Sequence, residues 1–243
     1  MKLALIQLDT VWESKKANFE KAESFIKTAC DNNCDIAVLP EMFSTGFSMN
    51  ISGVGEEENG ETPAFLSGLS KRYGIYVIAG FAEKSPGGPK GKNIAAVFDR
   101  KGTLAARYVK LHPFSHSGED RYYIAGDGIT TFKIDGVPSS VFICYDLRFP
   151  EVFRMAAKDV KIMFVLANWP ASRKGHWETL LRARAIENQC FIIGVNRAGV
   201  DGNGIEYHGL SRVFGPLGEE LCTGGTGEEA VICEIDPGRA DEA

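Results

Sequence analysis

Short apolar runs that alternate with longer amphipathic stretches are the feature that most restricts the fold of this 243-residue chain. The runs have the length of β-strands, and the stretches between them space their apolar residues as helices do. One such stretch follows Ser14 and reaches about Asn33, and another runs from about Gly175 to Gln189. Because strands that alternate with helices are typical of layered α/β proteins, we predict the α/β class. No repeat, linker or low-complexity segment divides the chain, so a single domain of residues 1–243 is expected.

The predicted strands are apolar and have turn-forming residues at their ends. They comprise residues 2–8, 35–39, 75–83, 93–99, 130–134, 138–143, 162–167, 191–196, 210–214 and 229–235. Two pairs of neighbouring strands are joined by turns: 75–83 and 93–99 by a turn with Pro and Gly residues, and 130–134 and 138–143 by the turn Asp135-Gly136. A further helix is predicted from about Pro63 to Tyr73.

Composition and charge exclude several classes of protein. The hydrophobic fraction of 44% and the charged fraction of 24% are ordinary for a globular protein. A net charge of −5 without a basic cluster gives no reason to expect nucleic-acid binding. The longest apolar runs have strand length, so we expect no membrane span and no membrane partner. The chain begins with a predicted strand rather than a signal peptide, and we therefore expect a cytoplasmic protein.

The cysteines and histidines do not form a recognisable framework. The six cysteines are scattered along the chain, so in a reducing compartment we expect no disulfides. The four histidines have no ligand spacing, and no Cys-x-x-Cys sequence occurs, so no metal site is expected.

One cysteine has a special position. The apolar run Ser139 to Ile143 ends at Cys144, and Pro150 is well placed as the first residue of a following helix. Backbone N–H groups and the dipole at a helix N-terminus favour the thiolate, which is the nucleophilic form of cysteine. By itself, however, a lone cysteine of this kind is more often a buried structural residue.

Two other segments carry candidate catalytic side chains. The apolar run Asp35 to Leu39 stops at a proline, and Glu41 follows at the carboxyl end of the strand, where α/β proteins place their functional groups. Lys110 follows another apolar-aromatic segment, and Glu119 lies nine positions further on. Taken alone, each of these charged residues would be interpreted as a surface residue.

Taken together, these segments resemble the nitrilase superfamily of carbon–nitrogen hydrolases. The resemblance rests on Leu-Pro-Glu at 39–41, the lysine segment 107–114, and Cys-Tyr-Asp-Leu-Arg-Phe-Pro-Glu at 144–151, and it spans residues 2–236. It implies a Glu-Lys-Cys triad of Glu41, Lys110 and Cys144, with Glu119 as the family's second glutamate. It further implies a four-layer α-β-β-α sandwich, no cofactor, and assembly into a homodimer or a higher homo-oligomer.

Amide cleavage by this triad has a clear chemical logic. Cys144 would attack the carbonyl carbon and form a thioester, while Glu41 would move the protons. Lys110 and the backbone N–H of Tyr145 would stabilise the oxyanion. Glu119 would orient Lys110 or the substrate amide. We also expect Lys110 to lower the pKa of the Cys144 thiol. The products would be ammonia and a carboxylate.

The segment after the triad suggests the substrate. The sequences 167–170, 183–189 and 196–197 resemble the bacterial omega-amidase branch, which hydrolyses the terminal amide of 2-oxoglutaramate or 2-oxosuccinamate. Such a small amide carries a carboxylate, for which Arg173 is the candidate partner because a guanidinium grips carboxylates with two hydrogen bonds. The candidate pocket walls are aromatic, namely Phe43, Phe114, Tyr145 and Trp169. Two local ion pairs are expected, Arg148 with Glu151 and Arg184 with Glu187.

Other functions remain open at this point. Within the superfamily the chain could be a deaminated-peptide amidase, an N-carbamoyl-amide hydrolase or a nitrilase. A catalytically silent binding protein on the same fold is a further alternative, against which the intact triad argues. A metal-dependent phosphoesterase would need a carboxylate and histidine constellation that the sequence lacks.

Overall fold

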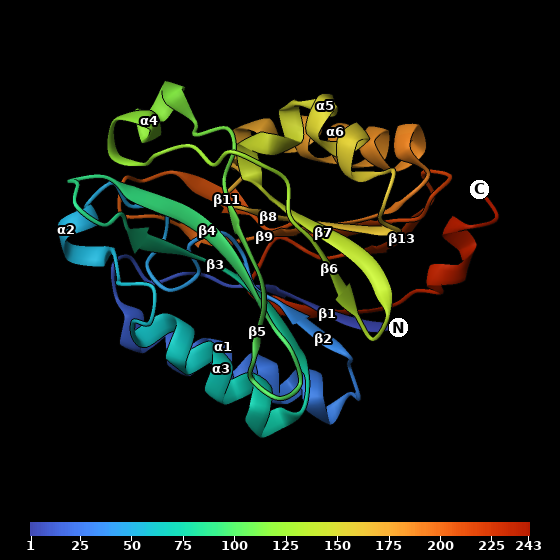
Figure 1. Cartoon of the computed structure of the whole chain (residues 1–243), viewed down its shortest axis with the longest axis horizontal. Coiled ribbons are helices and arrows are strands. Elements are labelled where there is room, and N and C mark those ends of the chain that lie inside the picture. Colours follow the sequence, from blue (N-terminus) through green and yellow to red (C-terminus); the bar gives the residue numbers. More distant parts are fainter.

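The computed structural model describes residues 1–243 and consists of two six-stranded sheets that pack face to face between helices (Figure 1). The strand order is β14-β1-β2-β3-β4-β5 in the first sheet and β13-β12-β9-β8-β7-β6 in the second. Helices α1 and α3 cover the outer face of the first sheet, and α5 and α6 cover that of the second (Figure 1). This arrangement confirms the α-β-β-α sandwich that the resemblance implied.

The bounds of the elements follow. The first sheet contains β1 (Lys2–Gln7), β2 (Ile36–Val38), β3 (Tyr76–Lys84), β4 (Gly91–Phe98), β5 (Leu104–Val109) and β14 (Glu229–Glu234). The second contains β6 (Thr131–Ile134), β7 (Val137–Ile143), β8 (Ile162–Ala167), β9 (Phe191–Asn196), β12 (Arg212–Phe214) and β13 (Glu220–Thr223), and β10 (Ala198–Val200) with β11 (Glu206–His208) forms a separate hairpin. The α-helices are α1 (Lys15–Asp31), α2 (Ile51–Val54), α3 (Glu61–Tyr73), α4 (Glu119–Tyr122), α5 (Pro150–Ala156) and α6 (Lys174–Asn188). Short 3₁₀ turns are η1 (Ser115–Ser117), η2 (Cys144–Arg148), η3 (Ala171–Arg173) and η4 (Pro237–Ala240).

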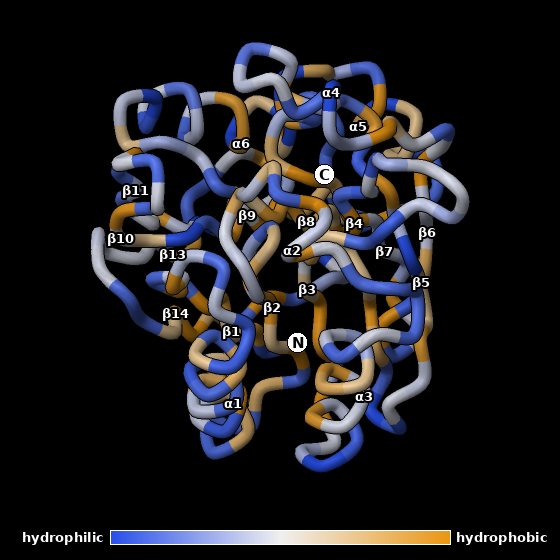
Figure 2. Tube along the Cα trace, turned by 90° about the vertical axis from the view of Figure 1, so that its left-hand side faces the viewer, coloured by the Kyte–Doolittle hydropathy of each residue, from blue (hydrophilic) through white to orange (hydrophobic).

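Burial on both faces explains why the central strands read as continuous apolar runs. Along β1, Leu3 and Leu5 belong to the large core cluster that contains residues of both sheets. The alternate residues Ala4 and Ile6 pack in the second cluster, beneath α1 and α3. Figure 2 shows the same distribution, with hydrophobic residues along the central strands and hydrophilic residues on the outer helices and loops.

All ten predicted strands are present in the structure, and β8 and β9 have the predicted bounds. The sequence analysis missed β5, β13 and the β10–β11 hairpin. β5 is an edge strand whose first residues are exposed, and the short β13 has only polar or half-buried positions. Such strands lack the apolar pattern on which the prediction depends.

A disulfide joins the two sheets, which corrects the expectation that no disulfide would form. Cys222 of β13 and Cys233 of β14 are bonded across the edge of the sandwich, with their Cα atoms 6.0 Å apart. The other four cysteines are free thiols. Spacing along the chain gave no signal for this pair, because the contact is between edge strands of different sheets.

None of the helices combines the length and the apolar composition that crossing a bilayer requires.

Candidate active site

The parallel strands bring three polar residues to one end of the sandwich. In the first sheet β1, β2 and β3 run parallel, and in the second β7, β8 and β9 do so. Glu41 lies just beyond the carboxyl end of β2, and Cys144 and Asn168 directly follow β7 and β8. The carboxyl ends of parallel strands are where an open α/β sheet binds its ligands.

Glu41 is fully buried and is held against the neighbouring strand. A Cβ atom at Gly80 of β3 would come within 2.7 Å of the Cα atom of Glu41, so only glycine permits this close approach. The backbone N–H of Phe43 also donates to the Gly80 carbonyl, at 2.9 Å. Backbone packing therefore helps to fix the segment that carries Glu41.

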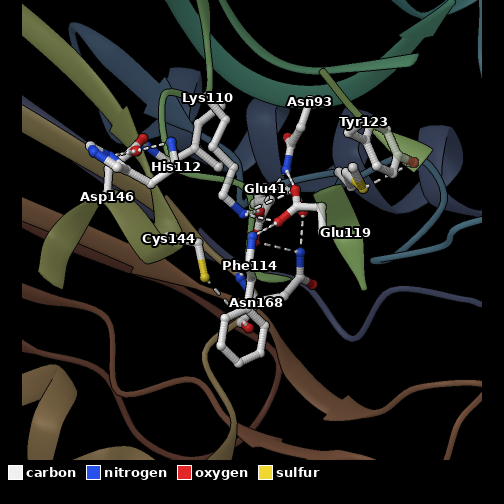
Figure 3. A network of polar contacts seen from close by, with 12 residues as sticks. Glu41, Asn93, Lys110, His112, Phe114, Glu119, Tyr123, Cys144, Asp146 and Asn168 are labelled. Atoms are coloured by element: carbon white, nitrogen blue, oxygen red, sulfur yellow. Dashed lines mark hydrogen bonds and ion pairs between the residues drawn. The ribbon is translucent and has the colours of Figure 1, made fainter. Parts of the chain in front are cut away.

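Lys110 lies between two carboxylates in the interior (Figure 3). Its Nζ atom is 2.8 Å from Glu41 Oε1 and 2.9 Å from Glu119 Oε2, and all three side chains are at most 1% exposed. The ammonium occupies the position between the carboxylates, and no group of His, Cys, Asp and Glu side chains elsewhere could hold a metal ion. The structure thus brings the predicted Glu41, Lys110 and Glu119 into direct contact.

Two asparagines that the sequence analysis did not select complete the network around Glu41. Asn93 Nδ2 donates to Glu41 Oε1 and to Glu119 Oε1, both at 2.8 Å. The backbone N–H of Asn168 donates to Glu41 Oε2, and its Nδ2 donates to the Glu41 carbonyl, again at 2.8 Å. For Asn168 a signal existed, since it follows an apolar strand directly, as Cys144 does. A buried polar residue inside a strand, such as Asn93, gives only a weak one.

Cys144 begins a 3₁₀ turn with its backbone in the left-handed region, at φ 45°. Pro150 is the first residue of α5, as predicted, but the turn η2 separates it from Cys144. The thiol therefore lies at the predicted strand-to-helix junction, at the start of η2 and not at the N-terminus of α5 itself. The Sγ atom instead contacts the Asn168 carbonyl at 3.8 Å. The N–H groups at the start of such a turn have no partner within it, which leaves that of Tyr145 available to a ligand.

Asp146 fixes this turn to the lysine segment. Its buried carboxylate accepts the backbone N–H of Ile143 at 3.0 Å, the hydroxyl of Tyr108 at 2.7 Å and the backbone N–H of His112 at 2.9 Å. The His112 ring stacks on Phe149, with 3.7 Å between ring centroids. The Asp146 carboxylate therefore connects the cysteine turn to the lysine segment. The spacing of these residues along the sequence does not indicate this contact.

The electrostatics of the site favour a neutral thiol and an ionised Glu41. Burial and the charge of Glu41 raise the pKa of Cys144 well above its usual range, and Lys110 opposes this only in part. Lys110 lowers this pKa, as expected, but burial and the two neighbouring carboxylates outweigh its effect.

The two carboxylates differ in pKa. Burial alone would raise the pKa of Glu41, but the charge of Lys110 and hydrogen bonds from Lys110, Asn93 and Asn168 bring it below its usual value. Burial raises the pKa of Glu119, since the attraction of Lys110 is offset by the nearby Glu41 charge. If the pair takes up a proton, Glu119 receives it first.

A cavity of about 310 Å³ opens onto Cys144. Phe114, Tyr145, Trp169 and Arg173 line it, as predicted. Phe43 does not, because it is fully buried beneath α1 beside Phe19. Phe47, four residues further on, lines the cavity in its place.

Two arginines line the cavity without a carboxylate partner. The guanidinium of Arg173 lies over the Phe114 ring, 5.1 Å from its centroid. Arg148 forms no ion pair with Glu151, contrary to expectation. It lies over the Trp169 ring at 5.2 Å and donates to His176 Nδ1 at 2.9 Å. The other predicted pair, Arg184 with Glu187, is confirmed at 3.0 Å.

The carbon–nitrogen hydrolase family model matches residues 2–243. The chain belongs to this family. This carbon–nitrogen hydrolase is 35% identical to a 2-oxoglutaramate amidase of Bacillus subtilis, and the alignment covers 96% of this chain and 90% of that protein. It is 36% identical to the omega-amidase YafV of Yersinia enterocolitica, covering 96% of this chain and 88% of that protein.

Solved structures of this family agree with the fold. The CN-hydrolase superfamily protein XC1258 of Xanthomonas campestris, which has an arsenic adduct in its active site, superposes with a TM-score of 0.93 at 30% identity. That alignment covers all of this chain and 92% of XC1258. Nit3 of Saccharomyces cerevisiae, a member of branch 10 of the nitrilase superfamily, gives a TM-score of 0.91 at 29% identity, again over all of this chain and 92% of the other. This carbon–nitrogen hydrolase is thus an enzyme of the amidase type on the nitrilase-superfamily fold.

Proposed function

We propose that this hydrolase is an omega-amidase that uses Cys144 as its nucleophile and releases ammonia from the terminal amide of 2-oxoglutaramate or 2-oxosuccinamate. The observation that carries the proposal is the cavity, which ends at Cys144 and is lined by two guanidinium groups that lack an acidic partner. The names of the similar proteins from Bacillus and Yersinia support the same substrate class.

The first half-reaction forms the thioester. Glu41, which is ionised, takes the proton of the neutral Cys144 thiol as the sulfur attacks the amide carbon. The carbonyl oxygen becomes an oxyanion, which the Tyr145 N–H and a Lys110 N–H stabilise. The C–N bond then breaks, its electron pair stays on nitrogen, and Glu41 returns the proton so that ammonia leaves.

The second half-reaction hydrolyses the thioester. Glu41 is again ionised and takes a proton from water, whose oxygen attacks the thioester carbon. The same donors stabilise the second oxyanion. The C–S bond breaks, Glu41 protonates the sulfur, and the acid product leaves as a carboxylate. Glu119 acts as a positioning residue, because its carboxylate binds the Lys110 ammonium together with Glu41.

Arg173 recognises the substrate carboxylate in this proposal. Its guanidinium lies over the Phe114 ring, and the planar guanidinium group can form two parallel hydrogen bonds with a carboxylate. The walls formed by Phe114, Tyr145 and Trp169 exclude water from the substrate chain.

A substrate panel tests the proposal. We expect ammonia release from 2-oxoglutaramate and 2-oxosuccinamate to exceed that from glutamine, an N-carbamoyl amine and a nitrile. Cys144→Ala is the blank and should retain less than about a hundredth of the activity, since only residual catalysis survives loss of a nucleophile. A clear preference for the carbamoyl compound, the nitrile or a deaminated peptide would assign one of the other superfamily activities.

We also propose that two copies associate through the α5–α6 face. Met155 of α5, Ile186 of α6 and the nearby Leu217 are 57%, 53% and 69% exposed. Exposed apolar residues that gather on one face are typical of an interface. Light scattering during gel filtration would give the mass, and Ile186→Glu should shift it toward the 26.5 kDa of one chain.

A further inference from the structure

The Phe47 side chain connects the cavity to the Lys110 ammonium. Phe47 lines the same cavity as Cys144, whereas Lys110 is buried and does not line it. The Lys110 Nζ atom lies over the Phe47 ring, 5.3 Å from its centroid. A cation within about 6 Å of an aromatic centroid is attracted by the negative face of the ring. The two side chains therefore form a cation–π pair next to the cavity.

The loop that carries Phe47 is held on both sides of this residue. Gly46 has a φ of 76°, which glycine adopts without strain, and its N–H donates to the Met42 carbonyl at 2.8 Å. The carbonyl of Ser48 accepts the hydroxyl of the buried Tyr123 at 2.6 Å. The Phe47 ring itself packs against the small core cluster that contains Met42 and Tyr123. The position of the ring is therefore well defined.

The partners of the Lys110 ammonium differ in how they respond to proton transfer. Burial alone would lower the pKa of Lys110, but the charges of Glu119 and Glu41 raise it well above its usual value, so the ammonium stays charged. The carboxylates of Glu41 and Glu119 accept its hydrogen bonds at 2.8 and 2.9 Å. A carboxylate loses its charge when it takes up a proton, whereas the Phe47 ring cannot be protonated and keeps its attraction for the cation.

We propose that Phe47 is a positioning residue for Lys110, whose ring holds the ammonium in place while the oxyanion forms. The inference rests on the proposed amidase mechanism, in which Glu41 takes the thiol proton as the sulfur attacks. When Glu41 is neutralised in this step, its attraction for the ammonium weakens, but that of the ring does not. The ring thus matters more in the transition state than in the resting enzyme, and its loss should lower kcat. Phe47 forms no bond and moves no proton.

A simple wall of the cavity would behave differently. A wall contacts the bound substrate and the transition state equally, so its loss raises KM and leaves kcat unchanged. Phe47→Leu keeps an apolar side chain but removes the ring face. We expect kcat to fall about three- to thirty-fold, the range for a cation–π pair shielded from water. KM should change less than kcat.

Ring fluorination tests the interaction with almost no change in the shape of the side chain. Phenylalanine analogues with one, two or three ring fluorines, incorporated at position 47, weaken the negative face of the ring in steps. The logarithm of kcat should fall with the number of fluorines. Phe25 of α1 is the matched control, because it is also half-buried but has no lysine or arginine over its ring. The same series at position 25 should leave kcat unchanged.

Two kinetic results would overturn the proposal. One is a kcat that does not depend on fluorination at position 47, including the case in which only KM rises. The other is an equal decline of kcat in the Phe25 series. Urea unfolding gives a measurement that does not require activity. The free energy of unfolding should fall with fluorination at position 47 relative to position 25, and parallel series would contradict the cation–π pair.

Failure of the proposed function would be recognised separately. If the wild type does not hydrolyse 2-oxoglutaramate, the proposed substrate is wrong. The fluorine series is then measured with an amide that the enzyme accepts, because Lys110 would meet the oxyanion of any amide attacked by Cys144. A decline of kcat with that amide would support the role of Phe47 although the substrate assignment had failed.

Discussion

Lys110 and Glu41 form an ion pair, with 2.8 Å between Nζ and Oε1, that has almost no contact with solvent. Glu119 contacts the same ammonium, so one positive charge serves two buried carboxylates. Buried charges are tolerated only when they are paired, and removal of one partner leaves the others uncompensated. The lysine therefore contributes to folding as well as to any role in catalysis.

Lys110→Met should destabilise the protein by about 3–5 kcal/mol, the usual cost of breaking a buried ion pair. Urea unfolding at neutral pH measures this. The control is Lys27→Met, whose partner Asp31 lies on the surface and whose loss should change the stability little. Equal effects of the two substitutions would contradict the importance assigned to the buried cluster.

Glu41→Gln should lower kcat by about 10²–10⁴-fold, the range for a general acid–base residue. The raised pKa of Cys144 is the reason, because without a base the thiol remains protonated at neutral pH. The substitution keeps the size of the side chain, so melting temperature serves as the folding control. Turnover at the wild-type rate would refute the proton-transfer role.

The pH profile of kcat/KM should be flat through neutrality. Glu41 must be ionised, and its pKa lies below the ordinary glutamate value of about 4.3, so activity falls only when the pH drops below that value. Glu119, whose pKa is raised, takes up the first proton and leaves Glu41 ionised. On the alkaline side the thiol keeps its proton beyond the usual cysteine value of about 8.5. An acid limb near neutrality would point to a different base.

Arg173→Met should lower kcat/KM for 2-oxoglutaramate. The loss of transition-state stabilisation should be about 1.5–3 kcal/mol, the worth of a hydrogen bond to a charged group. Activity on an amide without a carboxylate should change little. Arg148→Met is the comparison, because Arg148 lines the same cavity and also lacks an acidic partner. A carboxylate-specific loss only in Arg148→Met would move the recognition site to that residue, and equal losses on both substrates would indicate a structural role.

Reduction of the Cys222–Cys233 disulfide should lower the free energy of unfolding by about 3 kcal/mol, the chain-entropy value for a loop closed over 11 residues. Thiol titration of the unfolded chain should give four reactive groups before reduction and six after it. Melting curves with and without a reductant give the stability change. Cys30→Ser serves as the control, because it removes a thiol outside the bridge.

The fold could be predicted where burial on both faces leaves continuous apolar strands, as in β8 and β9. It could not be predicted for β5, an edge strand whose first residues are exposed. In the site, Glu41, Lys110 and Cys144 were accessible through their motif. Phe43 was misplaced because position after a strand does not reveal on which side of the sheet a ring packs. Asp146 was missed because its partners, Tyr108 and His112, are distant in sequence.

Met42 and Cys144 have φ values of 46° and 45°, in a region that L-residues avoid. One directly follows the proposed base and the other is the proposed nucleophile. Each such conformation costs on the order of 1–3 kcal/mol and persists only because the surrounding structure enforces it. The packing of the sandwich thus maintains backbone strain in the two turns that carry the proposed base and nucleophile. A glycine would relieve the backbone strain at either position. At position 144 it would also remove the proposed nucleophile, so the least strained sequence for this backbone would be catalytically inactive.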